Sequence, residues 1–161
     1  MIRKCTSEDT DRLYCIINTA AKAYDGIIAE DCYHQPYMPR EELEQEMKRV
    51  NFYGWEADGD TVGVMGIERV KDVTLIRHAY VLPDYQDRGI GRKLLEHLME
   101  LIDTPQLLVG TWKDAAWAVR FYEKNGFKLL PEKDELLSEY WDITQRQIET
   151  SVVLGIKINN D

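Results

Sequence analysis

The chain has 161 residues, of which 20 are basic and 29 acidic, so its formal net charge at neutral pH is −9. This length favours one domain over residues 1–161, and a hydrophobic fraction of 44% supplies a buried core, which excludes disorder as the main description. The negative charge argues against a nucleic-acid-binding protein, and no apolar run is long enough to span a membrane.

The N-terminal third alternates between strand and helix patterns. Ile2–Thr6 has the apolar–polar alternation of a short strand, and Ser7 is a candidate N-cap for the helix that follows. Asp31–Pro39 has no periodicity and is predicted to be a loop. Arg40–Val50 is predicted to be a second helix, with the acidic run Glu41–Glu46 on its solvent-exposed face.

Three extended segments follow, and an Asp-Gly turn between the first two indicates a hairpin. These segments are Phe52–Ala57, Thr61–Ile67 and Val73–Leu82. After Pro83 the patterns predict a helix at Gly89–Ile102, a strand at Leu107–Trp112, a helix at Ala115–Asn125 and strands at Phe127–Leu130 and Glu149–Ile158. Glu132–Ile143 has no clear pattern. This order predicts an α/β (α+β) domain with a mixed sheet and excludes a regular doubly wound fold.

The cysteines do not form a recognisable framework. Their number is odd, no two are separated by two residues, and none lies beside a histidine: they are Cys5, Cys15 and Cys32. Met1–Thr10 carries charged residues and no apolar stretch, unlike a secretory signal. We therefore predict reduced thiols, no metal site and a cytoplasmic location.

Val81–Gly91 is the most informative segment. An extended run ends there, and Gly89 and Gly91 stand in the first turn of a helix, where glycine is normally unfavourable. Two glycines are useful if a ligand must approach the backbone, because the free amides and the dipole of a helix start bind anions. Arg88 and Arg92 add local positive charge. The segment therefore predicts a phosphate-bearing ligand.

Two common phosphate motifs do not fit this segment. A dinucleotide-binding fingerprint needs a third glycine where Leu94 stands, and the Gly-Lys-Ser/Thr end of a Walker loop is missing. The glycines have an alternative explanation, in which they only allow a tight, well-packed corner between a strand and a helix.

Gln86, Gly89 and Gly91 fill the three defined positions of Gln/Arg-x-x-Gly-x-Gly/Ala. The segment thus resembles the acyl-CoA motif of the GNAT superfamily of acetyl-CoA-dependent N-acetyltransferases. A second similarity lies at Ala118–Phe127, where that family often shows Ala-x-x-Phe-Tyr-x-x-x-Gly-Phe. The order of elements agrees along the whole chain. The resemblance implies a single GNAT-like domain whose central sheet is mixed, mostly antiparallel and flanked by helices, with a splayed strand pair that receives CoA.

The resemblance also implies acetyl-CoA as co-substrate, no metal, and a set of cofactor-binding residues. Backbone groups of Ala79 and Val81 would pair with the pantetheine amides. Backbone N–H groups from Gln86 to Arg92 would hold the pyrophosphate. The residues concerned are Gln86, Asp87, Arg88, Gly89, Ile90, Gly91 and Arg92.

In such an enzyme a substrate amine attacks the thioester directly, and the resemblance implies that Tyr122 protonates the departing thiolate. The glutamate base of many relatives is replaced here by Leu75. His78 is a candidate base, because an imidazole titrates near neutral pH, and strand alternation places it on the face opposite Ala79 and Val81. A structural role for His78 is the alternative, and Glu68, Tyr80 or a water chain are further candidates for the base.

The acceptor is expected to be a small-molecule or peptide amine. The aromatic loop Cys32–Met38 is a candidate wall of its pocket, and Asp25, Glu30 and Asp31 are candidates to attract a cationic amine; the alternative is an ordinary surface loop. No nucleic acid and no membrane is expected as a partner, and a homodimer is left open.

Two other functions are considered. A CoA-binding or sensor module with little or no turnover is favoured by Leu75 and by Ala115, which stands where the family often has an asparagine. A phosphate- or nucleotide-binding protein of another class is the third hypothesis, and the similarity at Ala118–Phe127 argues against it.

Overall fold

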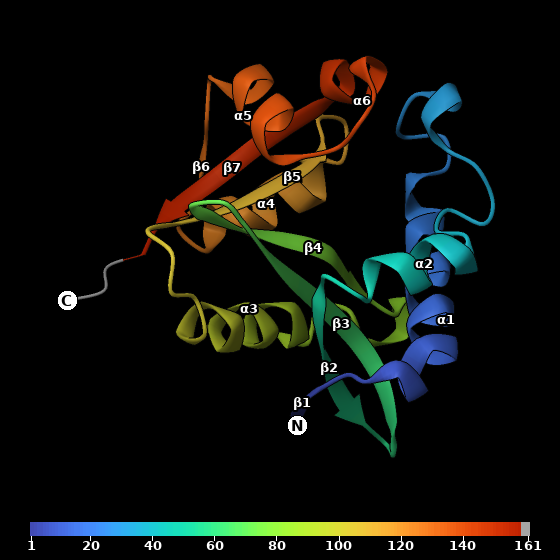
Figure 1. The fold of residues 1–161 in the computed structure, drawn as a ribbon. Helices are drawn as coiled ribbons and strands as arrows, with labels where there is room; N and C mark the ends of the chain where they lie inside the picture. The colour runs from blue at the N-terminus through green and yellow to red at the C-terminus, as the bar shows by residue number, and fades with distance from the viewer. Residues whose placement is uncertain (159–161) are drawn as a thin grey trace. The chain divides into compact units, whose positions relative to one another are not determined.

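The computed structural model describes residues 1–158, in which seven strands form one sheet in the order β1-β2-β3-β4-β5-β7-β6, flanked by helices (Figure 1). The strands are β1 (Ile2–Lys4), β2 (Asn51–Ala57), β3 (Asp60–Val70), β4 (Val73–Val81), β5 (Gln106–Trp112), β6 (Lys128–Leu129) and β7 (Ser151–Lys157). The helices are α1 (Thr10–Ala20), α2 (Arg40–Glu46), α3 (Ile90–Glu100), α4 (Ala116–Lys124), α5 (Lys133–Tyr140) and α6 (Gln145–Thr150). Short 3-10 turns are η1 (Ser7–Asp9), η2 (Ala21–Tyr24), η3 (Glu30–Cys32) and η4 (Pro83–Tyr85). The pairs β1–β2, β2–β3, β5–β7 and β6–β7 are antiparallel, and the predicted α/β class is confirmed.

The chain forms two compact units. Unit 1 comprises Met1–Ala23, His34–Glu68 and Ile76–Leu101, and unit 2 comprises Tyr24–Tyr33, Arg69–Leu75 and Ile102–Asp161. The hairpin of β3 and β4 contributes residues to both units. None of the helices within residues 1–158 combines the length and the apolar character needed to cross a membrane. The single domain expected over residues 1–161 stays a prediction.

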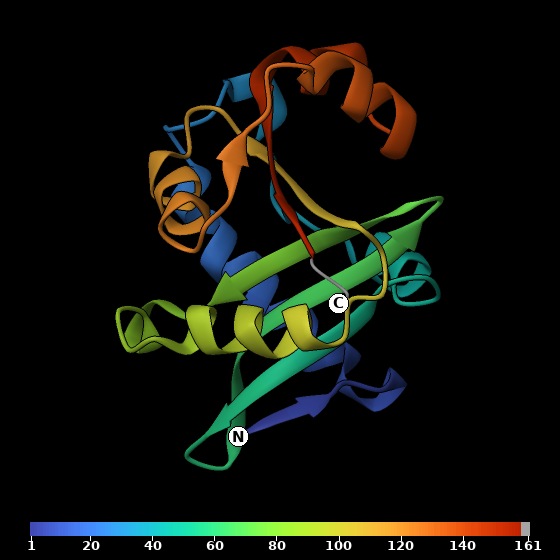
Figure 2. The ribbon, with the colours of Figure 1, turned by 90° about the vertical axis from the view of Figure 1, so that its left-hand side faces the viewer.

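In unit 1, helices lie on both faces of the strands, with α1 on one side and α3 on the other (Figures 1 and 2). Strand β3 explains this arrangement, because successive residues of a strand point to opposite faces. Val64 belongs to the core shared with α1 and α2. A Cβ at its neighbour Gly63 would lie 3.0 Å from Ile90 and 3.6 Å from Leu94, so the missing side chain lets α3 pack closely. The core on the α1 side consists of Leu13, Ile16, Ile17, Met38, Leu43, Val50, Phe52 and Val64.

In unit 2, β7 lies between β5 and β6 and pairs antiparallel with both. Gly155 of β7 has close neighbours, since a Cβ there would lie 2.8 Å from Leu108 and 2.9 Å from Leu130. Helix α5 contributes Leu137, which is 1% exposed, to the core of this unit. That core consists of Val73, Leu75, Leu108, Leu137, Ile148 and Val153.

The largest difference from the predicted elements lies near the C-terminus. The segment Glu132–Ile143, which had no clear pattern, contains α5, and the predicted strand Glu149–Ile158 begins inside α6. Helix α6 starts with a capping box, in which the Thr144 side chain accepts a hydrogen bond from the Gln147 amide while the Gln147 side chain accepts one from the Thr144 amide. The Thr-x-x-Gln spacing was therefore a readable signal for this helix.

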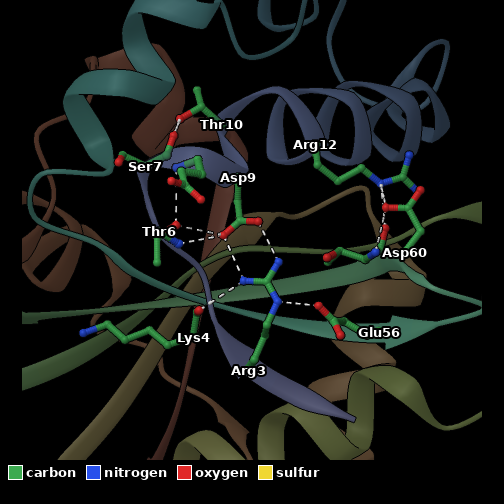
Figure 3. A network of polar contacts seen from close by, with 11 residues as sticks. Arg3, Lys4, Thr6, Ser7, Asp9, Thr10, Arg12, Glu56 and Asp60 are labelled. Atoms are coloured by element: carbon green, nitrogen blue, oxygen red, sulfur yellow. Dashed lines mark hydrogen bonds and ion pairs between the residues drawn. The ribbon is translucent and has the colours of Figure 1, made fainter.

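Strand β1 is joined to the first turn of the chain by a network of polar contacts (Figure 3). Arg3 donates two hydrogen bonds to the Asp9 carboxylate, at 2.6 and 3.0 Å, and its Nε pairs with Glu56 of β2. Asp9 also accepts a hydrogen bond from the backbone N–H of Thr6, at 2.7 Å. Thr6, and not the predicted Ser7, is the N-cap of this first turn, because Thr6 and Asp9 form a capping box.

This network predicts a loss of stability in acid. The hydrogen bonds from Arg3 are the main reason why the pKa of Asp9 is lowered from 3.8 to about 2. A carboxyl whose pKa is lower in the folded state stabilises the fold above its unfolded pKa, and the contribution is lost as the pH falls through the folded value. We expect Asp9→Asn to lower the free energy of unfolding at pH 7 by about 1 kcal/mol, a value reduced for the partial solvent exposure of Arg3.

The measurement is urea unfolding of both proteins at pH 7 and near pH 2, where the difference should be much smaller. Glu8→Gln, which changes an exposed acid in the same turn, is the control and should have little effect. A difference of the same size at both pH values would show that Asp9 contributes by packing and not by charge.

Candidate active site

The loop between β4 and α3 ends in a left-handed conformation that leaves the start of α3 uncapped. Asp87 has a φ of 61° and Gly89 a φ of 79°. Gly89 is the N-cap of α3, and no side chain caps the first amides of the helix. A Cβ at Gly89 would meet nothing within 4 Å, so the glycine serves the backbone conformation and not packing. The explanation of Gly89 as a packing residue is therefore wrong.

The charges around this helix start favour an anion. The first turn of α3 contains no acidic residue, so nothing there opposes the positive end of the helix dipole. Arg88 donates a hydrogen bond to the Asp84 carbonyl at 2.9 Å, and its guanidinium lies 5.0 Å from the centre of the Tyr85 ring. Arg92 pairs with Glu96 at 2.9 Å on the exposed surface of the helix.

Two hydrogen bonds hold this loop against the strands of unit 1. The Leu82 amide donates to the Val62 carbonyl of β3 at 2.9 Å, and Gln86 Nε2 donates to the Val81 carbonyl at 3.0 Å. The Gln86 side chain thus ties the loop back to the end of β4. Ala79 and Val81 are half-buried on β4.

His78 lies inside β4 in an unusual backbone conformation, with a φ of 56°. Among the described residues, the other non-glycine residues with positive φ lie in or beside turns: they are Asp58, Lys71 and Asp87. The left-handed residue interrupts the strand's alternation, so the predicted face of His78 does not follow from a period of two. Its ring stacks on Phe52 of β2, with centroids 6.0 Å apart and an interplanar angle of 21°.

Glu46, the last residue of α2, is only 3% exposed. The prediction that Glu41–Glu46 is a solvent-exposed acidic face is therefore wrong at this residue. Glu46 Oε1 accepts hydrogen bonds from His78 Nε2 at 2.8 Å and from Arg77 Nη2 at 2.9 Å. Burial raises the pKa of Glu46, but the hydrogen bond from His78 and the positive charges of Arg77 and Arg49 outweigh it, and the pKa is lowered.

Glu68, another candidate base, is engaged with two guanidinium groups. Its Oε1 accepts a hydrogen bond from Arg77 at 2.9 Å, and its Oε2 lies 3.2 Å from Arg49 Nε. Both carboxylate oxygens are thus paired with positive charge.

Tyr122 lies on α4 in unit 2 and is 4% exposed. Its ring packs edge-on against Phe121, with centroids 5.0 Å apart, and lies tilted against the Phe127 ring at 5.4 Å. Burial, and secondarily Tyr24, raises the pKa of the Tyr122 phenol well above its ordinary value. The phenol therefore keeps its proton at neutral pH, as a general acid must. Ala115, the N-cap of α4, is fully buried.

Three residues of the predicted acceptor region have contacts that the structure defines. Met38 is 3% exposed, and its amide donates a hydrogen bond to Asn18 at 2.7 Å, so it belongs to the core of unit 1. Asp31 forms an ion pair with Arg146 at 2.8 Å, which offsets its negative charge. His34 Nδ1 lies 2.8 Å from the Pro36 carbonyl of its own loop.

Within residues 1–158, no group of three His, Cys, Asp or Glu side chains is arranged to hold a metal ion. Cys5, Cys15 and Cys32 are free thiols. Burial raises the pKa of Cys5 to about 11, so this thiol is not a nucleophile at neutral pH.

A family model described as an acetyltransferase (GNAT) domain matches residues 48–129, slightly more than half of the 161-residue chain. The chain belongs to the GNAT acetyltransferase family. It is accordingly an acyltransferase, as the motifs around Gly89 and Tyr122 predicted.

Solved GNAT structures resemble this protein over nearly its whole length. PaiA N-acetyltransferase from Thermoplasma acidophilum, in complex with coenzyme A, is 22% identical with a TM-score of 0.74, and the match covers 98% of each chain. A GNAT-family acetyltransferase from Staphylococcus aureus is 18% identical with a TM-score of 0.76 and 99% of each chain covered. The ribosomal-protein-S18-alanine N-acetyltransferase from Escherichia coli is 20% identical with a TM-score of 0.71, covering 100% of this chain and 95% of the other. At these identities the similarity shows a shared fold.

In this GNAT protein, the predicted cofactor-binding residues all lie between the end of β4 and the start of α3, within unit 1. Sequence reasoning missed Glu46, because an acidic residue in a run of exposed acids gives no local sign of burial. The matched segment begins at residue 48 and does not include it. Only the contact with β4 distinguishes Glu46 from its neighbours.

Proposed function

We propose that this GNAT protein transfers the acetyl group of acetyl-CoA to a primary amine by direct attack in a ternary complex. The observation that carries the proposal is the start of α3, where Gly89 leaves the first amides uncapped and the first turn has no acidic residue. Free N–H groups at the positive end of a helix fit a pyrophosphate. The similarity in fold to a relative solved with coenzyme A supports the same reading.

Two parts of unit 1 would hold the CoA moiety. Backbone groups of Ala79 and Val81 would pair with the pantetheine arm. The pyrophosphate would lie on the backbone of Gln86, Asp87, Arg88, Gly89, Ile90, Gly91 and Arg92. Acetyl-CoA supplies a thioester, whose C–S bond breaks as the amine nitrogen forms a bond to the carbonyl carbon.

The chain's own residues would move the protons. His78 takes the proton that the amine loses, and Tyr122 gives its proton to the departing thiolate. Glu68 is the weaker candidate for the base, because both of its oxygens are paired with arginines. Tyr80 and a water chain remain further candidates for the base.

The proposed acceptor is a small-molecule or peptide amine, with no role for nucleic acid or a membrane. The similarity in fold to a ribosomal-protein-S18-alanine N-acetyltransferase supports including peptide N-termini. A homodimer and a cytoplasmic location stay predictions.

The test is an acetylation screen with two readouts. Release of CoA thiol is measured with a panel of small amines, lysine peptides and peptides with free N-termini, and binding of acetyl-CoA is measured by calorimetry. Binding with turnover supports the proposal. Binding without turnover on any amine would favour the CoA-binding or sensor module instead. That alternative is considered because Leu75 stands where many relatives have a glutamate base. No binding would overturn both.

The assignment of His78 as the base predicts a pH-dependent loss. We expect His78→Asn to lower kcat at pH 7 by about 10²-fold, the lower end of general-base effects, and to lower it much less near pH 10. A free alkylamine has a pKa near ~10.4 and loses its own proton at high pH. Asparagine is chosen because it tolerates a left-handed backbone.

The measurement is the pH profile of kcat for both proteins with one good amine. His97→Asn, at another histidine of unit 1, is the matched control and should leave the profile unchanged. A loss of equal size at every pH would indicate that His78 has a structural role only.

A further inference from the structure

Five side chains of unit 1 form a polar cluster that no family motif accounts for. They are Glu46, Arg49, Glu68, Arg77 and His78, from α2, the segment after it, β3 and β4. Glu46 is at its centre, because His78 Nε2 and Arg77 Nη2 both donate to its Oε1 and Arg49 Nη2 lies 3.6 Å from the same oxygen. The Glu46 side chain is 4% exposed.

The charges in this cluster balance without His78. Arg77 bridges Glu46 and Glu68, at 2.9 Å to each, and Arg49 also contacts both carboxylates. Two guanidinium groups therefore face two carboxylates. Beside them, Glu46 Oε1 presents a charged hydrogen-bond acceptor to the imidazole, 2.8 Å from His78 Nε2.

We propose that Glu46 is a positioning residue that accepts the Nε2–H of His78, fixes this tautomer and leaves Nδ1 as the nitrogen that takes the amine's proton. The inference rests on the proposed function, in which His78 is the base. The proton passes from the amine to Nδ1, directly or through one water, and the imidazolium later releases it to solvent. Glu46 stays ionised throughout and stabilises the imidazolium by its negative charge.

Two features of the cluster are unfavourable for stability alone. Glu46 Oε2 is buried and is the one buried side-chain polar atom of residues 1–158 without a hydrogen-bond partner. An ionised oxygen left unpaired in the interior costs free energy, which a carboxylate kept only for stability would avoid. His78 holds a left-handed conformation inside a strand, and strained residues of this kind are concentrated at functional sites. Both costs are explained if the contact between the two side chains serves the reaction.

The surroundings of the ring also favour a fixed orientation. The ring is stacked on Phe52 on one side and bonded to Glu46 through Nε2, so its rotation is limited. A base held in this way loses little entropy when the amine binds.

The first test depends neither on turnover nor on a variant of Glu46. The chain has three histidines, so the ring nitrogens of the ¹⁵N-labelled protein can be assigned by NMR with His78→Asn as the reference. We expect a single Nε2–H tautomer for the neutral ring of His78. An Nδ1–H tautomer, or a mixture of the two, would overturn the inference. Because this readout does not require acetyl transfer, it separates failure of the inference from failure of the proposed function.

The second test is a double-mutant cycle. Glu46→Gln keeps the volume and one acceptor oxygen but removes the charge that stabilises the imidazolium. We expect it to lower kcat about tenfold in the parent, with KM for the amine unchanged, and less than about twofold in the His78→Asn background. Equal losses in both backgrounds would overturn the inference, because a merely structural residue does not act through His78.

Glu44→Gln is the matched control on the same helix. Glu44 is exposed and pairs with Arg40 at 3.1 Å, so its substitution should leave kcat unchanged in both backgrounds. Should Glu46→Gln fail to fold, the tautomer of His78 in the parent protein still decides the question.

Discussion

Gly89→Val should raise the dissociation constant for acetyl-CoA at least about tenfold, equivalent to about 1.4 kcal/mol of binding free energy. The φ of 79° at Gly89 is unfavourable for any side chain and most unfavourable for a β-branched one. Relief of that strain moves the amides at the start of α3. The side chain itself enters the open space beside Gly89, where the pyrophosphate is proposed to lie.

Gly26→Val is a close control for this experiment. Gly26 has a φ of 78° and, like Gly89, nothing within 4 Å of an added Cβ, so both substitutions carry the same local strain. Gly26 lies between η2 and η3, in unit 2. We expect Gly26→Val to lower the melting temperature by a similar amount while CoA affinity stays within about twofold of the parent. If Gly89→Val folds and binds CoA with the parent's affinity, the pyrophosphate site is not at α3.

Tyr122→Phe should lower kcat by about 10²-fold, the lower end of the range for general-acid help. The leaving group is a thiolate, whose thiol has a pKa near ~8.5, so the acid is useful but not indispensable. Phenylalanine retains the ring that packs against Phe121 and Phe127 and removes only the hydroxyl. CoA affinity and the melting temperature should therefore change little.

The pKa of Tyr122 adds a second expectation. Because burial raises it above the ordinary value of 10, the phenol stays protonated up to at least that pH. The kcat of the parent should therefore show no descending limb from this residue below about pH 10. Tyr140→Phe is the matched control, because it removes a tyrosine hydroxyl elsewhere in unit 2. The Tyr140 hydroxyl donates a hydrogen bond to Asp72 at 2.7 Å, and its loss should leave kcat unchanged. If the Tyr122→Phe protein has the parent's kcat while the chemical step is rate-limiting, Tyr122 is not the general acid and its role is packing.

The loop and helix start where the pyrophosphate is proposed to lie could be located from the sequence because their signals are local. An extended run followed by Gln86, Gly89 and Gly91 defines a strand, a turn and a helix start within a few residues. The hairpin at Asp58-Gly59 and the amphipathic α3 were readable for the same reason. Helices α5 and α6 were missed because their apolar residues are too few to give a clear period, and only the capping box at Thr144 marked either of them.

The identity of the group that faces His78 was decided by the tertiary structure. Glu46 belongs to a run of acidic residues in which Glu41, Glu42 and Glu44 are exposed, and no local pattern separates it from them. Glu46 is buried because α2 ends against β4. This packing places Glu46 beside His78, which lies 32 positions further along the chain. The left-handed backbone of His78 could not be predicted from the sequence either, because a regular strand would satisfy the local sequence equally well. Local periodicity specifies elements, whereas burial of a charge depends on partners that only folding brings together.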